Sequence, residues 1–230
     1  LPDALHAPEK ALGDAETTLR GLTDDGLSVA PFGARRQELQ VAYGALAAGA
    51  EADPLTAHDA LPALVEKVEA FVEAVRRIEQ ATRVARDEVA PALERTLARV
   101  DVLRAGGTRV EEPGFEPGAM VAGVRSLLVA ARDRIASGND QAGWERVGRA
   151  RARAAELEAL VEATVRARDT TAGRLLTLTT DIEELRRGIG PASAALNALR
   201  TEHADAALRP ALDNIEEAGA ALTVATTCVN

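Results

Sequence analysis

The sequence contains very few aromatic residues, a single cysteine and no long apolar run. Aromatic residues make up 2% of the 230 residues, so a hydrophobic core has to be built from leucine, valine and alanine. Cys228 is the only cysteine, which excludes an intramolecular disulfide. No apolar run reaches the ~18–20 residues that a helix needs to cross a bilayer. We therefore expect no disulfide-stapled fold and no direct membrane insertion by this segment.

Basic residues are scarce relative to acidic ones. The chain has 27 Lys and Arg against 36 Asp and Glu, which gives a formal net charge of −9 at pH 7. Nucleic acids and anionic membrane surfaces bind proteins through basic surfaces, so we expect neither as the main partner. Lys10 and Lys67 are the only lysines, and this arginine bias favours codon usage in a GC-rich genome over a selected phosphate-binding surface.

The residue types that carry most enzyme chemistry form no known pattern here. His6, His58 and His203 are the only histidines and lie in no Glu-x-x-His or His-Glu-x-x-His pattern, so neither a di-iron bundle nor a zinc site is supported. Gly106-Gly107-Thr108-Arg109 lacks the Gly-Lys-Ser/Thr ending of a P-loop. No serine lies in a nucleophile elbow. The sequence predicts no catalytic, cofactor-binding or metal-binding residue, and therefore a non-enzymatic protein.

Helix-forming residues dominate the composition. Alanine is the best helix former, followed by leucine, arginine and glutamate, and all four are abundant, whereas alternating strand patterns are missing. The fold class predicted is therefore all-α. Apolar residues spaced three and four apart, as in coiled-coil seams, predict helices over residues 8–23, 30–50, 56–105, 117–138, 141–188 and 192–224.

Glycine and proline predict where these helices end. Gly49 and the residues up to Asp53-Pro54 predict a loop, and residues 106–118 predict the longest loop of the chain. Pro91 lies inside the first long stretch and predicts a kink or a short break. Gly188-Ile189-Gly190-Pro191 predicts the end of the second long stretch. A further interruption is a candidate between Glu202 and Pro210.

Part of the first long stretch recurs later in the sequence. Six residues reappear at an offset of 93, namely Leu64, Val68, Glu69, Ala70, Val72 and Ala74 as Leu157, Val161, Glu162, Ala163, Val165 and Ala167. Four more positions match at an offset of 82, three of them with identical residues: Leu93, Val100, Leu103 and Arg104 correspond to Leu175, Ile182, Leu185 and Arg186. The offsets differ by 11 residues, about three helical turns, so the apolar face is kept. Such a period is typical of helical repeat proteins.

The order of helices predicts tandem antiparallel three-helix bundles that share long connecting helices. Residues 1–82 would form bundle one, residues 83–165 bundle two, and residues 166–230 a partial third bundle, a helical hairpin. This layout resembles spectrin-type repeats, including those of bacterial cell-division scaffolds, over nearly the whole chain and without an invariant motif. A start at Leu1 instead of Met is expected for a processed product or for a piece excised from a longer protein, and the incomplete third bundle favours the excised piece.

One segment carries a second resemblance. Residues 136–147, Ala-Ser-Gly-Asn-Asp-Gln-Ala-Gly-Trp-Glu-Arg-Val, and the Arg/Ala-rich residues that follow look like the helical tails of actinobacterial membrane proteins that carry a TPM domain. No TPM domain is present in this sequence. The resemblance implies a helical portion of a membrane-attached bacterial parent. We expect a cytoplasmic chain, or the soluble part of such a parent.

Four residues are candidate contacts to a partner: Phe115, Trp144, Arg149 and Arg153. Trp144, the only tryptophan, follows a predicted Gly138 cap, where it either anchors the end of a bundle or serves as a hot spot for a partner. Phe115 lies among turn-forming residues and either plugs a bundle junction or offers a docking point. Arg149 and Arg153 belong to a locally basic stretch that is either a solvated, salt-bridged face or a patch for an acidic partner.

The sequence favours a non-enzymatic helical scaffold or spacer that binds a protein partner or a second copy of itself. The alternative is a helical bundle that binds a small apolar molecule as a sensor or carrier, which would show as a cavity with converging polar groups. Binding to a lipid surface would need Lys/Arg-rich polar faces with inserted aromatic residues. This acidic, aromatic-poor chain lacks both.

Overall fold

The computed structural model describes residues 2–111 and 114–229, and every regular element in them is a helix. The described residues contain no β-strand, so the predicted all-α fold class is confirmed. The chain forms two compact units, residues 1–162 and residues 163–230. No helix in the described part is both long and apolar enough to cross a bilayer.

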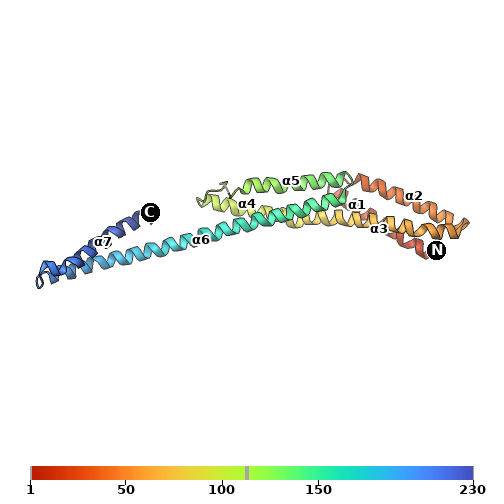
Figure 1. The fold of residues 1–230 in the computed structure, drawn as a ribbon. Helices are drawn as coiled ribbons and strands as arrows, with labels where there is room; N and C mark the ends of the chain where they lie inside the picture. The colour runs from red at the N-terminus through yellow and green to blue at the C-terminus, as the bar shows by residue number, and fades with distance from the viewer. Residues whose placement is uncertain (1, 112–113, 230) are drawn as a thin grey trace. The chain divides into compact units, whose positions relative to one another are not determined.

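The helices follow the predicted order (Figure 1). Their bounds are α1 Pro2–Asp24, α2 Ala30–Ala52, α3 Pro54–Val84, the π-helical turn η1 Ala85–Val89, α4 Ala90–Ala105, α5 Pro117–Ala136, α6 Asp140–Leu199 and α7 Asp205–Val229. Helix α6 begins in the first unit and ends in the second.

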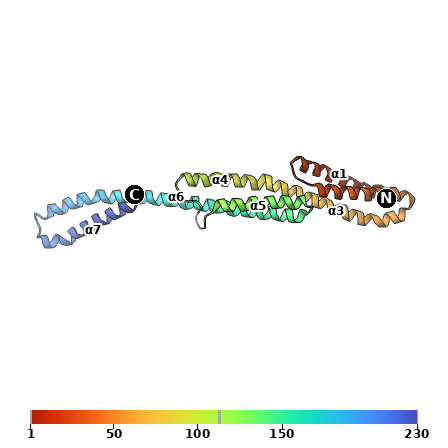
Figure 2. The same ribbon diagram turned by 90° about the horizontal axis from the view of Figure 1, so that it is seen from above.

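Helices α1, α2 and α3 pack against one another, as both views of the ribbon show (Figures 1 and 2). Their core holds two of the few aromatic residues of the chain, Phe32 and Phe71, together with aliphatic side chains such as Leu12, Val68 and Ile78. Each of these five side chains is at most 2% exposed. Burying a side chain of this size stabilises the fold by about 1.5–3 kcal/mol, so this core holds the three helices together.

The loop between the second and third helices is shorter than predicted. Helix α2 continues through Gly49 to Ala52, because this stretch is rich in alanine, and only Asp53 separates it from α3. The Asp53 carboxylate caps α3 by accepting hydrogen bonds from the Thr56 backbone N–H at 3.2 Å and the Thr56 hydroxyl at 2.7 Å. These bonds lower the pKa of Asp53. Pro54 then fits the first helical turn, where no N–H is required.

The short break that Pro91 predicts as one alternative is absent, and a π-helical turn lies directly before the turn that contains this residue. Pro91 lies in the first turn of α4, directly after η1. The Ala90 N–H donates to the carbonyl of Ala85, five residues back, which is the hydrogen bond of a π-turn. The chain therefore stays helical from Pro54 to Ala105, about 78 Å at ~1.5 Å per residue.

Helices α4 and α5 and the first part of α6 lie side by side in both ribbon views (Figures 1 and 2). Their buried side chains include Leu93, Val100 and Leu103 of α4, Val121, Val124, Ala131 and Ile135 of α5, and Val147, Ala150, Ala154, Leu157 and Val161 of α6. This second core contains no aromatic residue among the buried side chains described, so it depends on close packing of small aliphatic groups.

The turn between α5 and α6 confirms the predicted cap and new helix start. Gly138 takes a φ of +86°, a left-handed conformation that suits glycine, and the Asn139 N–H donates to the Arg134 carbonyl at 2.9 Å. The Asn139 side-chain oxygen then accepts from the Ala142 N–H at 2.9 Å, which caps α6.

In the second unit, the end predicted at residues 188–191 is wrong. Helix α6 continues to Leu199, and the turn lies at residues 200–204. Pro191 and Arg187 are exposed, so water can reach the carbonyl that loses its helical hydrogen bond. The helix continues because α7 packs against it, which includes a 2.8 Å hydrogen bond from the Arg186 guanidinium to the Thr226 hydroxyl. Pro210 lies inside α7 and does not interrupt it.

A polar interval in the apolar stripe of α6 coincides with the boundary between the units. The buried apolar positions of α6 stop at Val161 and resume at Ile182. Between them Val165 is half-buried, and Arg168 and Thr171 are exposed. The unit boundary follows Glu162. The predicted division between bundles one and two, after residue 82, falls within the first unit and stays a prediction.

Candidate functional site at the π-helical turn

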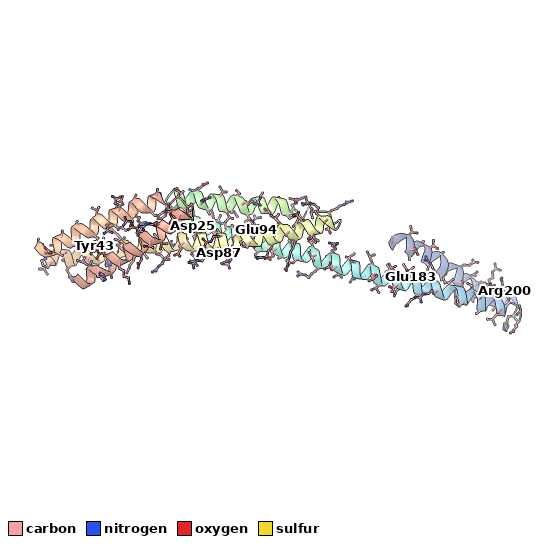
Figure 3. All side chains as sticks on the ribbon, turned by 180° about the vertical axis from the view of Figure 1, so that it is seen from behind. Asp25, Tyr43, Asp87, Glu94, Glu183 and Arg200 are labelled. Atoms are coloured by element: carbon pink, nitrogen blue, oxygen red, sulfur yellow. The ribbon has the colours of Figure 1, made fainter. Side chains whose placement is uncertain are left out.

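A groove of about 450 Å³ opens in the first unit where the α1–α2 loop meets α3, η1, α5 and α6. Its floor is apolar and consists of Leu27, Ala81, Ala85, Leu128, Ala131, Ile135 and Val147. Its polar side chains are Asp25, Thr82, Arg86 and Arg132. Figure 3 labels Asp25 and Asp87 in this part of the molecule. The groove lies beside η1, and π-turns are frequent at functional sites.

The α1–α2 loop forms one wall of the groove because of how α1 ends. Gly26 has a φ of +78°, and the Leu27 N–H donates to the Leu22 carbonyl at 2.9 Å, a glycine-based helix ending. This ending turns Leu27 and Val29 inward, where both are buried. The small side chain of Ala85 on the facing helix leaves the space open.

Arg86 ties the π-turn to the α1–α2 loop. Its guanidinium donates to the Asp87 carboxylate at 2.8 Å and to the Asp25 carboxylate at 3.1 Å. The hydrogen bond from Arg86 lowers the pKa of Asp87, and the bond to Asp87 raises the pKa of Arg86. Both shifts favour the charged forms of Arg86 and Asp87. Because they are exposed, the ion pairs fix geometry more than they add stability.

Arg132 is the cation with donors to spare. One terminal nitrogen of its guanidinium donates to the Gly26 carbonyl at 2.6 Å, and its other donors have no partner among the described residues. The side chain is exposed at the edge of an apolar floor. This combination can bind a molecule with an apolar body and an anionic group. The described residues contain no group of three or more His, Cys, Asp and Glu side chains placed to hold a metal ion.

The structure does not bring the four predicted contact residues together. Trp144 is half-buried on α6, one turn before the groove residue Val147. Arg149 is exposed and lies 4.0 Å from Glu145, and Arg153 is also exposed. Phe115 is half-buried just before α5, whose length of about 30 Å separates it from the turn that precedes Trp144. The roles of these residues stay predictions.

Sequence reasoning missed the groove. Its lining comes from four separate stretches of the sequence, residues 25–27, 81–86, 128–135 and 147, and no spacing rule brings them together. The only local signals were the glycine ending at Gly26 and the interior proline, Pro91, which follows the π-turn.

Neither the family models, the curated proteins nor the solved structures yield a match to this chain. The resemblances to spectrin-type repeats and to TPM-carrying proteins therefore stay predictions. Function has to be inferred from the geometry of the chain.

Proposed function

We propose that this chain is a non-enzymatic helical repeat scaffold or spacer that mediates protein–protein contact. In this proposal the first unit consists of two spectrin-like three-helix bundles that share the helix α3–η1–α4. The observation that carries the proposal is a set of polar contacts in constant register between α3–η1–α4 and the parallel first part of α6.

These contacts form three ion pairs at equal spacing. They join Arg77 to Asp140 at 3.3 Å, Glu88 to Arg151 at 2.8 Å, and Arg99 to Glu162 at 2.9 Å. From one pair to the next, the residue number rises by 11 in both helices, through 77, 88 and 99 in one and 140, 151 and 162 in the other. In α6 this interval equals about three turns of ~3.67 residues each, so α6 presents the same face at each pair.

The signs of the charges alternate along this series, which opposes slippage. A shift of α6 by one such interval would place Arg77 against Arg151 and Glu88 against Glu162, two like-charged contacts. An exposed ion pair contributes about 0–1 kcal/mol, so the pairs add little stability. The pairs instead favour one alignment of α6 along α3–η1–α4. A spacer whose helices cannot slide past one another keeps a constant length.

The spacer role is tested by pulling on the full chain. Cysteines at Leu55 and Val102, both exposed, serve as attachment points in a Cys228→Ser background. We expect the segment to hold its length until it unfolds in a cooperative step. Glu88→Arg should lower the unfolding force because it faces Arg151, and adding Arg151→Glu should restore it. Smooth extension from the lowest load, alike in all variants, would contradict the spacer role.

The groove favours a second candidate function, the binding of a small amphiphilic anion. The apolar floor suits the small apolar molecule of the alternative predicted from the sequence, and the spare donors of Arg132 add a position for an anionic group. A sensor or carrier module would hold the apolar body against the floor and the anionic group at the rim.

Decanoate is a suitable probe for the groove, and Trp144, one turn from Val147, is the fluorescence reporter. We expect saturable binding that Arg132→Gln weakens about fivefold, the effect of losing one exposed charged contact of about 1 kcal/mol. Arg134→Gln, an exposed arginine on the same helix that does not line the groove, should leave binding unchanged. Equal binding of decanoate by the Arg132→Gln and Arg134→Gln variants would rule out anion binding in the groove.

A further inference from the structure

The helical hairpin of the second unit leaves a row of apolar residues open. Every seventh residue of α6 from Leu178 to Leu199 belongs to this row, which we call the open row: Leu178, Leu185, Ala192 and Leu199. Leu185 is 61% exposed, and Leu178 and Leu199 are 45% and 41% exposed. By contrast, Ile182 and Leu196 on the adjoining row are buried. The hairpin therefore covers one row of the apolar stripe and exposes the other.

The second half of the open row lies in a segment without charge. Residues 188–199 contain no Asp, Glu, Lys or Arg, although 27% of the whole chain is charged. Most residues of this segment are exposed. Depletion of charge at an exposed apolar surface is typical of the centre of a protein–protein interface.

We propose that the open row pairs antiparallel with the open row of a second copy of this chain. A two-fold axis near Gly188 and Ile189 sets Leu185 against Ala192 of the other copy and Leu178 against Leu199 of the other copy. Each contact then occurs twice, as a two-fold interface requires. Large side chains meet small ones at the centre, next to Gly188, where the helices can approach closely.

The charges of α6 agree with this register. The antiparallel arrangement places residues 178–187, which carry Asp181, Glu183, Glu184, Arg186 and Arg187, against the uncharged residues 190–199. No like charges meet across the axis. A parallel arrangement in register would instead place each of these charges beside its own copy. The row spans about 33 Å of helix.

In the proposed scaffold role, the second copy of the chain is the protein partner. The self-pairing proposal therefore rests on that role. The two can fail separately, because self-pairing is measured on the second unit, whereas the pulling experiment reports on the first. If the chain holds its length under force but stays monomeric, the spacer role is supported and the self-pairing is ruled out.

Light scattering and sedimentation of the full chain test the pairing. We expect a dimer, and Leu185→Glu should raise its dissociation constant at least about tenfold, since a charge would face the apolar centre. Leu176→Glu, at a 71% exposed position outside the open row, should leave it unchanged. Circular dichroism checks that both variants keep their helical content. A monomer at all concentrations, or equal effects of both substitutions, would overturn the proposal.

Cysteine cross-linking tests the direction in a Cys228→Ser background. Cysteines at both Leu185 and Ala192 should form disulfides between chains on oxidation. They are about 10 Å apart along one helix, too far for a disulfide within it. Leu185→Cys alone should stay uncross-linked, since the antiparallel arrangement separates the two copies of residue 185. Efficient cross-linking by Leu185→Cys alone would overturn the antiparallel register.

Discussion

Replacing Phe71 with alanine should destabilise the first unit by about 3–5 kcal/mol, the cost of deleting a buried aromatic side chain. Phe71 is fully buried among α1, α2 and α3. With so few aromatic residues in the chain, neighbouring side chains are mostly too small to fill the cavity. Proteins are stable by only about 5–15 kcal/mol in total, so this loss is a large share. Urea unfolding followed by circular dichroism measures it.

A matched control comes from the same helix. Leu55→Ala removes an apolar side chain that is 79% exposed and should change the free energy of unfolding by less than about 0.5 kcal/mol. If Phe71→Ala were as mild as Leu55→Ala, the packing of α3 against α1 and α2 would be wrong.

Replacing Gly143 with alanine should also destabilise the first unit, by about 1–3 kcal/mol, the range for overpacking a core. An added Cβ would lie 2.5 Å from Cγ1 of Ile135 and 3.3 Å from the carbonyl oxygen of Ala131. Both residues are buried on α5, so neither can move away freely. Thermal and urea unfolding measure the loss.

Gly148→Ala is the control, because it lies on the same helix and its Cβ would meet nothing within 4 Å. It should stabilise the chain by up to about 1 kcal/mol, since alanine is the better helix former. In an Ile135→Ala background the cost of Gly143→Ala should largely vanish, and this coupling identifies the close contact as its cause. A Gly143→Ala variant as stable as Gly148→Ala would contradict the α5–α6 packing.

The parts of the fold that the sequence predicts correctly depend on local signals. Abundant alanine and leucine with three- and four-residue spacing predict helices, and Gly138 with Asn139 predicts the cap between α5 and α6. Both follow from the chemistry of neighbouring residues. Pro91 and Pro191 show where local reasoning fails. Both helices nevertheless continue, with a π-turn ahead of Pro91 and with α7 in contact with the helix that contains Pro191. Neither arrangement can be predicted from a few neighbouring residues.

The candidate functional features could be identified only from the structure. Each ion pair of the α3–η1–α4 and α6 register joins residues that are far apart in the sequence, and sequence spacing alone does not show which of many charged residues meet. The open row was visible in the sequence only as part of a longer apolar stripe. Knowing which half of that stripe α7 covers required the exposed fractions of the side chains.

The central claim is that α3, η1 and α4 form one continuous helix. Spin labels on cysteines at Leu55 and Val102, in the Cys228→Ser background of the pulling experiment, measure it by pulsed electron spin resonance. We predict a narrow distribution at about 70 Å, the length of a continuous helix between the two sites at ~1.5 Å per residue. A chain that folds back at Pro91 would bring the sites to about 40 Å. That distance would contradict the continuous helix and the spacer role with it.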